Sequence, residues 1–146
     1  MDGRGSRRVL IVDDDPALIA LLSDGLQLVG GYDVAVAADG ASGLDSCTTT
    51  LPACVIVDVR MPGLNGYQFV RALRGDPATA DVAIVVLSAL AQEREQIAGL
   101  LAGADAYLSK PVKMADLLAT VSDAVSLTPP QRTERRRTLL GDPRAK

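Results

Sequence analysis

The sequence predicts an α/β fold in which a doubly wound, five-stranded parallel sheet carries helices on both faces. Two observations support this prediction: five short apolar runs alternate with segments of helical length, and three of the runs are continuously apolar. Continuous runs are typical of strands that are buried on both faces, as in a parallel sheet. Right-handed crossovers between such strands then place helices on both sides. The expected strands, numbered 1 to 5 along the chain, are residues 9–12, 33–37, 54–57, 82–87 and 106–108. Their expected order across the sheet is 2-1-3-4-5.

Helices are expected between the strands, and local signals place their ends. Apolar residues recur at helical spacing over residues 16–29, which predicts an amphipathic helix. Asp15 is its expected N-cap, and Gly30-Gly31 is its expected end. Asp39 and Asn65 stand at the N-cap positions of two later helices. The later helices are expected at residues 41–48, 66–74, 91–102 and 114–125.

The composition argues against several classes of function. With 146 residues, 48% of them hydrophobic, the chain can form one domain with one core. Only 3% of the residues are aromatic, so a protein that stacks nucleic-acid bases on aromatic side chains is not expected. Cys47 and Cys54 lack metal-ligand spacing and there is no histidine, which argues against a zinc site and a disulfide framework. Two free thiols, no membrane-length apolar run and no signal peptide predict a cytoplasmic protein.

Charge is unevenly distributed along the chain. The net charge is −3, but six basic and two acidic residues follow Thr128, which gives this segment +4 and the remainder −7. An acidic body argues against direct nucleic-acid binding by the domain. Thr128-Pro129-Pro130 is expected to end the domain, because a residue before proline disfavours helix. The predicted organisation is a flexible N-terminus (1–7), one domain (8–127) and a basic flexible tail or linker stub (128–146), with a partial helix around 134–140.

Polar residues gather at the carboxyl ends of the predicted strands. Asp13 and Asp14 follow the first strand, Asp58 follows the third, Ser88 ends the fourth and Lys110 follows the fifth. In doubly wound sheets this edge carries the ligand, at the point where the strand order reverses. Clustered carboxylates repel one another, and an all-oxygen site favours Mg²⁺, with Mn²⁺ as the alternative. A metal and a lysine beside an aspartate can stabilise a transferring phosphoryl group, to which the serine hydroxyl can donate a hydrogen bond.

The residues around these positions resemble a known family. The segments Val9-Leu-Ile-Val-Asp-Asp14, Val55-Ile-Val-Asp-Val-Arg-Met-Pro-Gly-Leu-Asn-Gly66, Ile84-Val-Val-Leu-Ser-Ala89 and Gly103-Ala-Asp-Ala-Tyr-Leu-Ser-Lys-Pro111 are similar to the four signature segments of bacterial response-regulator receiver domains. The resemblance extends over residues 8–126 and implies the flavodoxin-like sheet of that family. It also implies a phosphoprotein of a two-component system that takes part in phosphorelay signal transduction.

The resemblance assigns a role to each residue of the metal site. Asp58 would be the phosphoacceptor, supplied by a histidine kinase, a phosphotransfer protein or a small phosphodonor. Asp14, Asp58 and the backbone carbonyl of Arg60 would bind Mg²⁺, and Asp13 would act mainly through water. The chain would not be an enzyme beyond slow self-dephosphorylation.

The resemblance also predicts a switch. Ser88, which stands where threonine is more frequent, and Lys110 would hold the phosphoryl group, and Tyr107 would turn inward as Ser88 moves. The Lys110–Pro111 peptide would be cis. Arg60 and Leu90 occupy positions that tune the lifetime of the phosphoryl group, and their bulk predicts a long one. The changed surface, residues 91–125, would control a downstream protein or an output domain.

Two other functions compete with this interpretation. Asp13 to Asp15 offer the Asp-x-Asp of haloacid-dehalogenase-like phosphatases, with Asp13 as nucleophile, but Ala17 stands where that family places threonine or valine. Alternatively, the chain is a receiver used only for docking, without phosphorylation, although Asp14, Asp58 and Lys110 are all present. Taken alone, Asp58 before a Met-Pro-Gly turn would be read as a turn residue.

Overall fold

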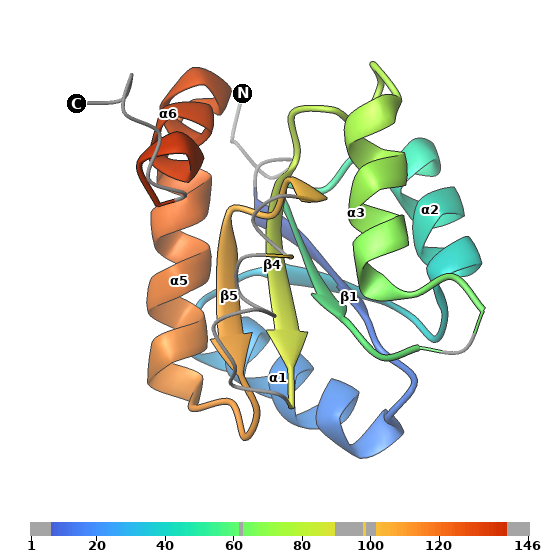
Figure 1. Cartoon of the computed structure of the whole chain (residues 1–146). Coiled ribbons are helices and arrows are strands. Elements are labelled where there is room, and N and C mark those ends of the chain that lie inside the picture. The colour runs from blue at the N-terminus through green and yellow to red at the C-terminus, as the bar shows by residue number, and fades with distance from the viewer. Residues whose placement is uncertain (1–6, 62, 90–97, 99–101, 140–146) are drawn as a thin grey trace.

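The computed structural model describes residues 7–61, 63–89, 98 and 102–139 and confirms the predicted sheet (Figure 1). All neighbouring strands are parallel, and their order is β2-β1-β3-β4-β5. The order therefore reverses beside β1, the point where the sequence places its cluster of aspartates. The strands are β1 (Arg8–Val12), β2 (Asp33–Ala37), β3 (Cys54–Asp58), β4 (Ala83–Ser88) and β5 (Ala106–Ser109).

The predicted helix starts are also confirmed. The side chain of Asp15 accepts hydrogen bonds from the first turn of α1, and Asp39 does the same for α2. Asn65 caps α3 in a reciprocal capping box with Gln68. The helix expected at 91–102 lies largely outside the described residues, and no helix in the described part is long and apolar enough to cross a membrane. The helices are α1 (Pro16–Leu28), α2 (Gly40–Thr49), α3 (Gly66–Gly75), α5 (Met114–Ser126) and α6 (Pro129–Leu139).

The sheet is packed between helices on its two faces. Leu22 and Leu26 of α1 share a core with residues of α5 on one face, and Phe69 of α3 packs with Cys47 of α2 on the other. The residues of β3 and β4 are buried throughout, which explains their continuous apolar sequences. Strand β5 differs, because all four of its residues are only half-buried.

The C-terminal segment corrects an expectation. Residues 128–146 were expected to be a flexible tail with a partial helix around 134–140, but Pro129 to Leu139 form the helix α6, which Figure 1 shows beside the end of α5. Arg132 of α6 is buried, with 7% of its surface exposed. Arg7, assigned to the flexible N-terminus, contacts the ring of Tyr32, 4.6 Å from its centroid. Residues 129–139 and Arg7 therefore pack against the domain.

The two cysteines are free and buried on opposite faces of the sheet, so no disulfide joins them. Burial raises the pKa of the Cys47 thiol to about 11 and that of Cys54 to about 12. Because the thiolate is the reactive form, both should react with a disulfide reagent such as DTNB far more slowly in the native protein than in urea. Rapid modification of either thiol without denaturant would contradict this burial.

Candidate functional site

Strand register brings Asp13 and Asp58 together. Val12 of β1 lies opposite Val57 of β3, so the next residue on each chain, Asp13 just after β1 and Asp58 at the end of β3, lies beside the other. Carboxylate oxygens of Asp13, Asp14 and Asp58 all lie within 4.8 Å of one another. Asp13 and Asp58 are buried, whereas Asp14 is exposed, so the cluster opens to solvent on the side of Asp14.

Lys110 completes the cluster from the far side of β4. Its backbone N–H donates to the carbonyl of Ser88 at 2.8 Å, which fixes the chain just after β5. Its Nζ lies 3.2 Å from Oδ2 of Asp58 and 3.6 Å from Oδ2 of Asp13. The predicted cis peptide between Lys110 and Pro111 is present.

The charges of the cluster do not balance. Among the described residues, one ammonium faces three carboxylates, and two unit charges 4 Å apart interact by about 4 kcal/mol at an effective dielectric near 20. Desolvation by burial is the largest cause that raises the pKa of Asp13, and the neighbouring Asp58 raises it further. Oδ1 of Asp13 accepts the backbone N–H of Asp15 at 3.0 Å, but its buried Oδ2 accepts no hydrogen bond. An oxygen-rich, unbalanced site of this kind fits a divalent cation.

The other predicted site residues lie around this cluster, and one lies outside the described residues. Ser88 is buried at the end of β4, and Tyr107 is half-buried on β5, paired with Val86. Arg60 is exposed, and its backbone N–H lies 3.4 Å from Oδ1 of Asp58. Leu90 is outside the described part of the chain.

Gly66 is a positioning residue that the sequence analysis did not single out. A Cβ at this position would lie 2.5 Å from the backbone oxygen of Asp58 and 2.7 Å from Cα of Val59. The N–H of Gly66 donates to the carbonyl of Val59 at 2.9 Å, so α3 begins directly against the end of β3. Glycine as the first residue after the N-cap Asn65 was the available signal, because side chains are normally accommodated there.

Magnesium should stabilise the protein at neutral pH, because a divalent cation relieves the repulsion among Asp13, Asp14 and Asp58. A ligand specific for the native state contributes about 2.7 kcal/mol at 100 times its dissociation constant. The pKa of Asp13 is higher in the folded protein than the ordinary value of 3.8, so the protonated carboxyl stabilises the fold at pH values below 3.8. This contribution is lost as the pH rises through the higher pKa of the folded state. The stabilisation by Mg²⁺ should therefore be large at neutral pH and shrink as the pH falls into this window.

Thermal melts with Mg²⁺ and with EDTA measure this effect. Asp14→Asn should reduce the shift, whereas Asp45→Asn, an equally charge-removing change on the exposed side of α2, should leave it intact. An equal loss in both variants would show that Mg²⁺ acts through general screening and not at the cluster.

Comparison with known proteins agrees with the family resemblance. The model of the response regulator receiver domain family matches residues 9–122. The chain is 46% identical over 119 residues to the transcriptional regulatory protein PrrA of Mycobacterium tuberculosis, an alignment that covers 82% of this chain and 50% of the relative. It is 40% identical over 114 residues to the DNA-binding dual master transcriptional regulator RpaA of Synechocystis, covering 78% and 47%. The chain thus spans about half the length of these curated relatives.

Solved structures give the same result. A putative response regulator from Chloroflexus aurantiacus superposes with a TM-score of 0.80 at 35% identity, over 83% of this chain and 98% of the other. The receiver domain of the sensor histidine kinase PA1611 from Pseudomonas aeruginosa, whose active-site cleft coordinates a magnesium ion, superposes with a TM-score of 0.76 at 29% identity, over 83% and 98%. The chain therefore belongs to the response regulator receiver domains of two-component systems.

Proposed function

We propose that the chain is a phosphorylation-activated switch in which a carboxylate oxygen of Asp58 accepts a phosphoryl group. The observation that carries this proposal is the position of Asp58: it is buried at the switch point of the sheet, 3.2 Å from the ammonium of Lys110 and beside two further carboxylates. The donor is a histidine kinase, a phosphotransfer protein or a small phosphodonor. The phosphorus–nitrogen or phosphorus–oxygen bond of the donor breaks as the bond to Asp58 forms, and the leaving group keeps the electron pair.

The proposed cofactor is Mg²⁺, with Mn²⁺ as the alternative. Asp14, Asp58 and the backbone carbonyl of Arg60 would hold the ion, and Asp13 would contact it through water. The ion would neutralise charge that develops on the transferring phosphoryl oxygens. The buried Oδ2 of Asp13, which accepts no hydrogen bond, and the exposed position of Asp14 support this assignment.

The proposed response begins at the phosphoryl group and spreads to one side of the domain. Lys110 pairs with a phosphoryl oxygen, the hydroxyl of Ser88 donates to another, and Tyr107 turns inward. Phosphorylation adds about −1.5 to −2 charge, enough to bias two arrangements of a loop and its neighbouring helix. The surface over residues 91–125 then controls a downstream protein or an output domain, as expected for a cytoplasmic phosphorelay component. The greater length of PrrA and RpaA supports an output domain in a longer protein.

Intact mass after incubation with acetyl phosphate and Mg²⁺ tests the proposal. The wild-type chain should gain one phosphoryl group, and Asp58→Asn should gain none. Asp45→Asn serves as the control, because it removes an exposed carboxylate outside the cluster. An unchanged wild-type mass would refute phosphoacceptance from a small donor, and an adduct in Asp58→Asn would move the site elsewhere. Turnover of a generic phosphate ester would favour the phosphatase alternative at Asp13.

The phosphoryl group on Asp58 should be long-lived. Arg60 lies two residues beyond the acceptor and Leu90 two beyond Ser88, and a bulky and an apolar side chain at these positions hinder an attacking water. Loss of the adduct mass, followed after removal of the donor, should take far longer than seconds, and Arg60→Ser should accelerate it. Decay of the wild-type adduct within seconds would contradict this role of Arg60 and Leu90.

A further inference from the structure

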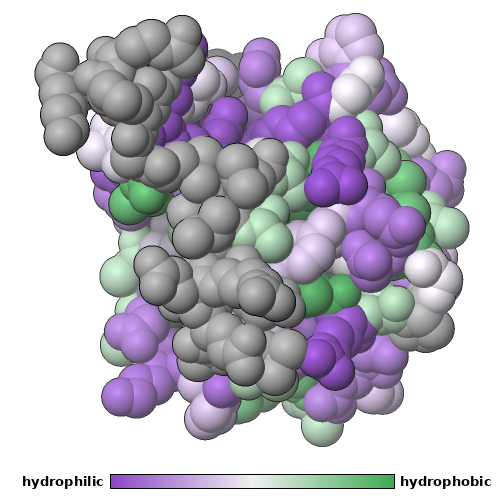
Figure 2. Space-filling model, in the orientation of Figure 1, coloured by the Kyte–Doolittle hydropathy of each residue, from purple (hydrophilic) through white to green (hydrophobic). Residues whose placement is uncertain are grey.

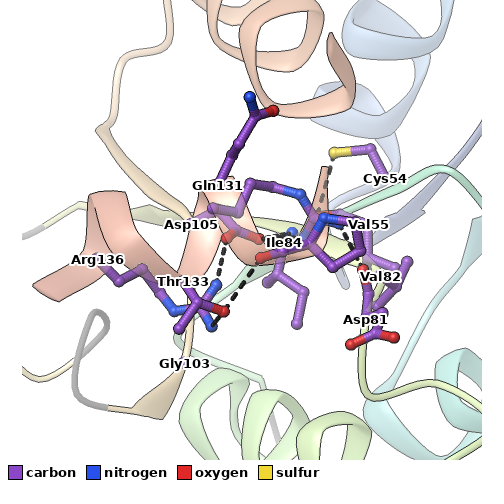
Figure 3. Close-up of polar contacts among 12 residues, drawn as sticks. Cys54, Val55, Asp81, Val82, Ile84, Gly103, Asp105, Gln131, Thr133 and Arg136 are labelled. Carbon is purple, nitrogen blue, oxygen red and sulfur yellow. Dashed lines mark hydrogen bonds and ion pairs between the residues drawn. The ribbon is translucent and has the colours of Figure 1, made fainter. Parts of the chain in front are cut away.

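A second charge cluster lies at the opposite edge of the sheet and ties α6 to the domain. Asp105, the residue before β5, is 6% exposed and pairs with Arg132 and Arg136 of α6. Arg132 also donates to the backbone carbonyl of Asp81 at 2.6 Å. Figure 3 shows Arg136 reaching from α6 toward Asp105, and Figure 2 shows hydrophilic residues gathered between α6 and α3. These contacts, together with the ion pair of Arg135 and Asp123 on α5, are called the α6 latch below.

Asp105 anchors the latch in the body of the domain. Its Oδ2 accepts the backbone N–H of Ile84 in β4 at 2.8 Å and lies 3.0 Å from the guanidinium of Arg74 in α3. Arg74 in turn donates to the backbone carbonyl of Gly103 at 3.0 Å and to that of Ala80 at 2.8 Å. One buried carboxylate therefore joins α6 to β4, α3 and the start of β5.

Strand β5 connects this anchor to the phosphoacceptor site. Asp105 precedes the strand and Lys110 follows it, and the five steps between them correspond to about 17 Å of extended chain. The residues of β5 are all half-buried, in contrast to the fully buried residues of β3 and β4. When Lys110 shifts toward a phosphoryl oxygen, β5 can therefore move with it while displacing fewer packed side chains than a movement of β3 or β4 would.

The latch also borders the side of the domain that carries Tyr107. An open cavity of about 810 Å³ is lined by Tyr107 of β5, Thr120 of α5, and Arg135 and Leu139 of α6. Helix α6 thus forms one wall of a concave surface on the side proposed to change upon phosphorylation. A rearrangement of Tyr107 alters the surface against which α6 lies.

We propose that the α6 latch and phosphorylation of Asp58 oppose each other: docked α6 stabilises the unmodified arrangement of β5, and phosphorylation weakens the docking. This inference rests on the proposed phosphoacceptor role of Asp58. Helix α6 lines the cavity beside Tyr107 in the arrangement in which Lys110 pairs with the carboxylate of Asp58. A phosphoryl oxygen that draws Lys110 away from this pair alters the arrangement, which sets the direction of the coupling. Coupling between two sites is reciprocal, so releasing the latch must favour the phosphorylated form by the same factor.

Hydrogen–deuterium exchange of the whole chain measures docking. Amides of residues 131–139 should exchange at least about tenfold faster in Arg132→Gln/Arg136→Gln than in wild type. Arg137→Gln is the matched control, because it makes the same arginine-to-glutamine change at a half-exposed side chain of α6 that pairs with Glu134 of the same helix. Adding beryllofluoride and Mg²⁺, as a mimic of the phosphoryl group, should accelerate the same amides in wild type.

Amide NMR titration with beryllofluoride measures the reciprocal effect. The half-saturating concentration should fall about fivefold or more in Arg132→Gln/Arg136→Gln, and not in Arg137→Gln. Saturation with unchanged exchange of α6 and unchanged affinity in the double variant would overturn the coupling and leave the phosphoacceptor role standing. Failure of beryllofluoride to bind and of acetyl phosphate to modify wild type would overturn both proposals.

Discussion

Asp105→Ala should destabilise the protein by about 3–5 kcal/mol, the loss typical of removing one partner from a buried ion pair. The carboxylate is 4% exposed and faces the guanidinium groups of Arg74, Arg132 and Arg136. Burial lowers the pKa of Arg74, and Asp105 is the group that opposes this effect. Without the carboxylate, three positive charges remain together, and the backbone N–H of Ile84 loses its acceptor. Urea unfolding followed by circular dichroism measures the change in free energy.

Two further variants are the comparisons for Asp105→Ala: one breaks an exposed ion pair, and the other removes the charge of Asp105 but keeps an oxygen. Asp123→Ala removes the partner of Arg135 in an exposed pair, with side chains 41% and 53% exposed, and should cost at most about 1 kcal/mol. Asp105→Asn keeps an oxygen for Ile84 and should fall between the two. If Asp105→Ala costs no more than Asp123→Ala, then the cluster does not hold α6 as the contacts indicate.

The sequence was sufficient to place the acidic cluster, because its aspartates lie at the ends of strands. Once residues 9–12 and 54–57 are parallel neighbours, Asp13 and Asp58 must lie together, whatever loops follow them. The same reasoning places Lys110 after β5, next to Ser88 at the end of β4. Short, continuous runs of β-branched residues predict where each strand lies and where it ends. These positions place the aspartates without knowledge of the loops or of side-chain packing.

The sequence was less informative about α6, although a local signal was present. Pro129 and Pro130 after Thr128 predict the end of the domain, but proline is also favoured in the first turn of a helix. Thr128 and Gln131 form a reciprocal cap: the N–H of Thr128 donates to the side chain of Gln131 at 2.8 Å, and the N–H of Gln131 to the hydroxyl of Thr128 at 3.3 Å. Thr-x-x-Gln with proline second is a helix start.

The anchor of α6 had no comparable signal. Asp105 lies 27 residues before Arg132 and 31 after Arg74, so their convergence depends on the finished fold. A run of arginines is usually solvated, and only a buried carboxylate at the sheet edge changes that interpretation here. The close approach of Gly66 to Asp58 was hidden in the same way, because it depends on how α3 leaves β3.

Lys110→Met should slow phosphorylation of Asp58 by about 100- to 1,000-fold, the loss typical of removing one charged or hydrogen-bonding group that stabilises a transition state. The ammonium lies 3.2 Å from Oδ2 of Asp58, where it can pair with a transferring phosphoryl oxygen. Methionine retains most of the length and apolar stem of lysine, so the change isolates the charge. The rate of adduct formation with acetyl phosphate, followed by intact mass at saturating Mg²⁺, measures the effect.

Lys113→Met is the matched control, because Lys113 is an exposed lysine three residues further along that makes no side-chain cap bond to α5. It should phosphorylate at nearly the wild-type rate. Lys110→Met also removes the ammonium paired with Asp13 and Asp58, so its apo form should be less stable and gain more from Mg²⁺ than wild type. A variant that responds to Mg²⁺ in this way yet phosphorylates normally would show that Lys110 balances the carboxylates and takes no part in phosphoryl transfer. If Lys110→Met binds Mg²⁺ normally but is phosphorylated slowly, then the ammonium of Lys110 acts on the transferring phosphoryl group.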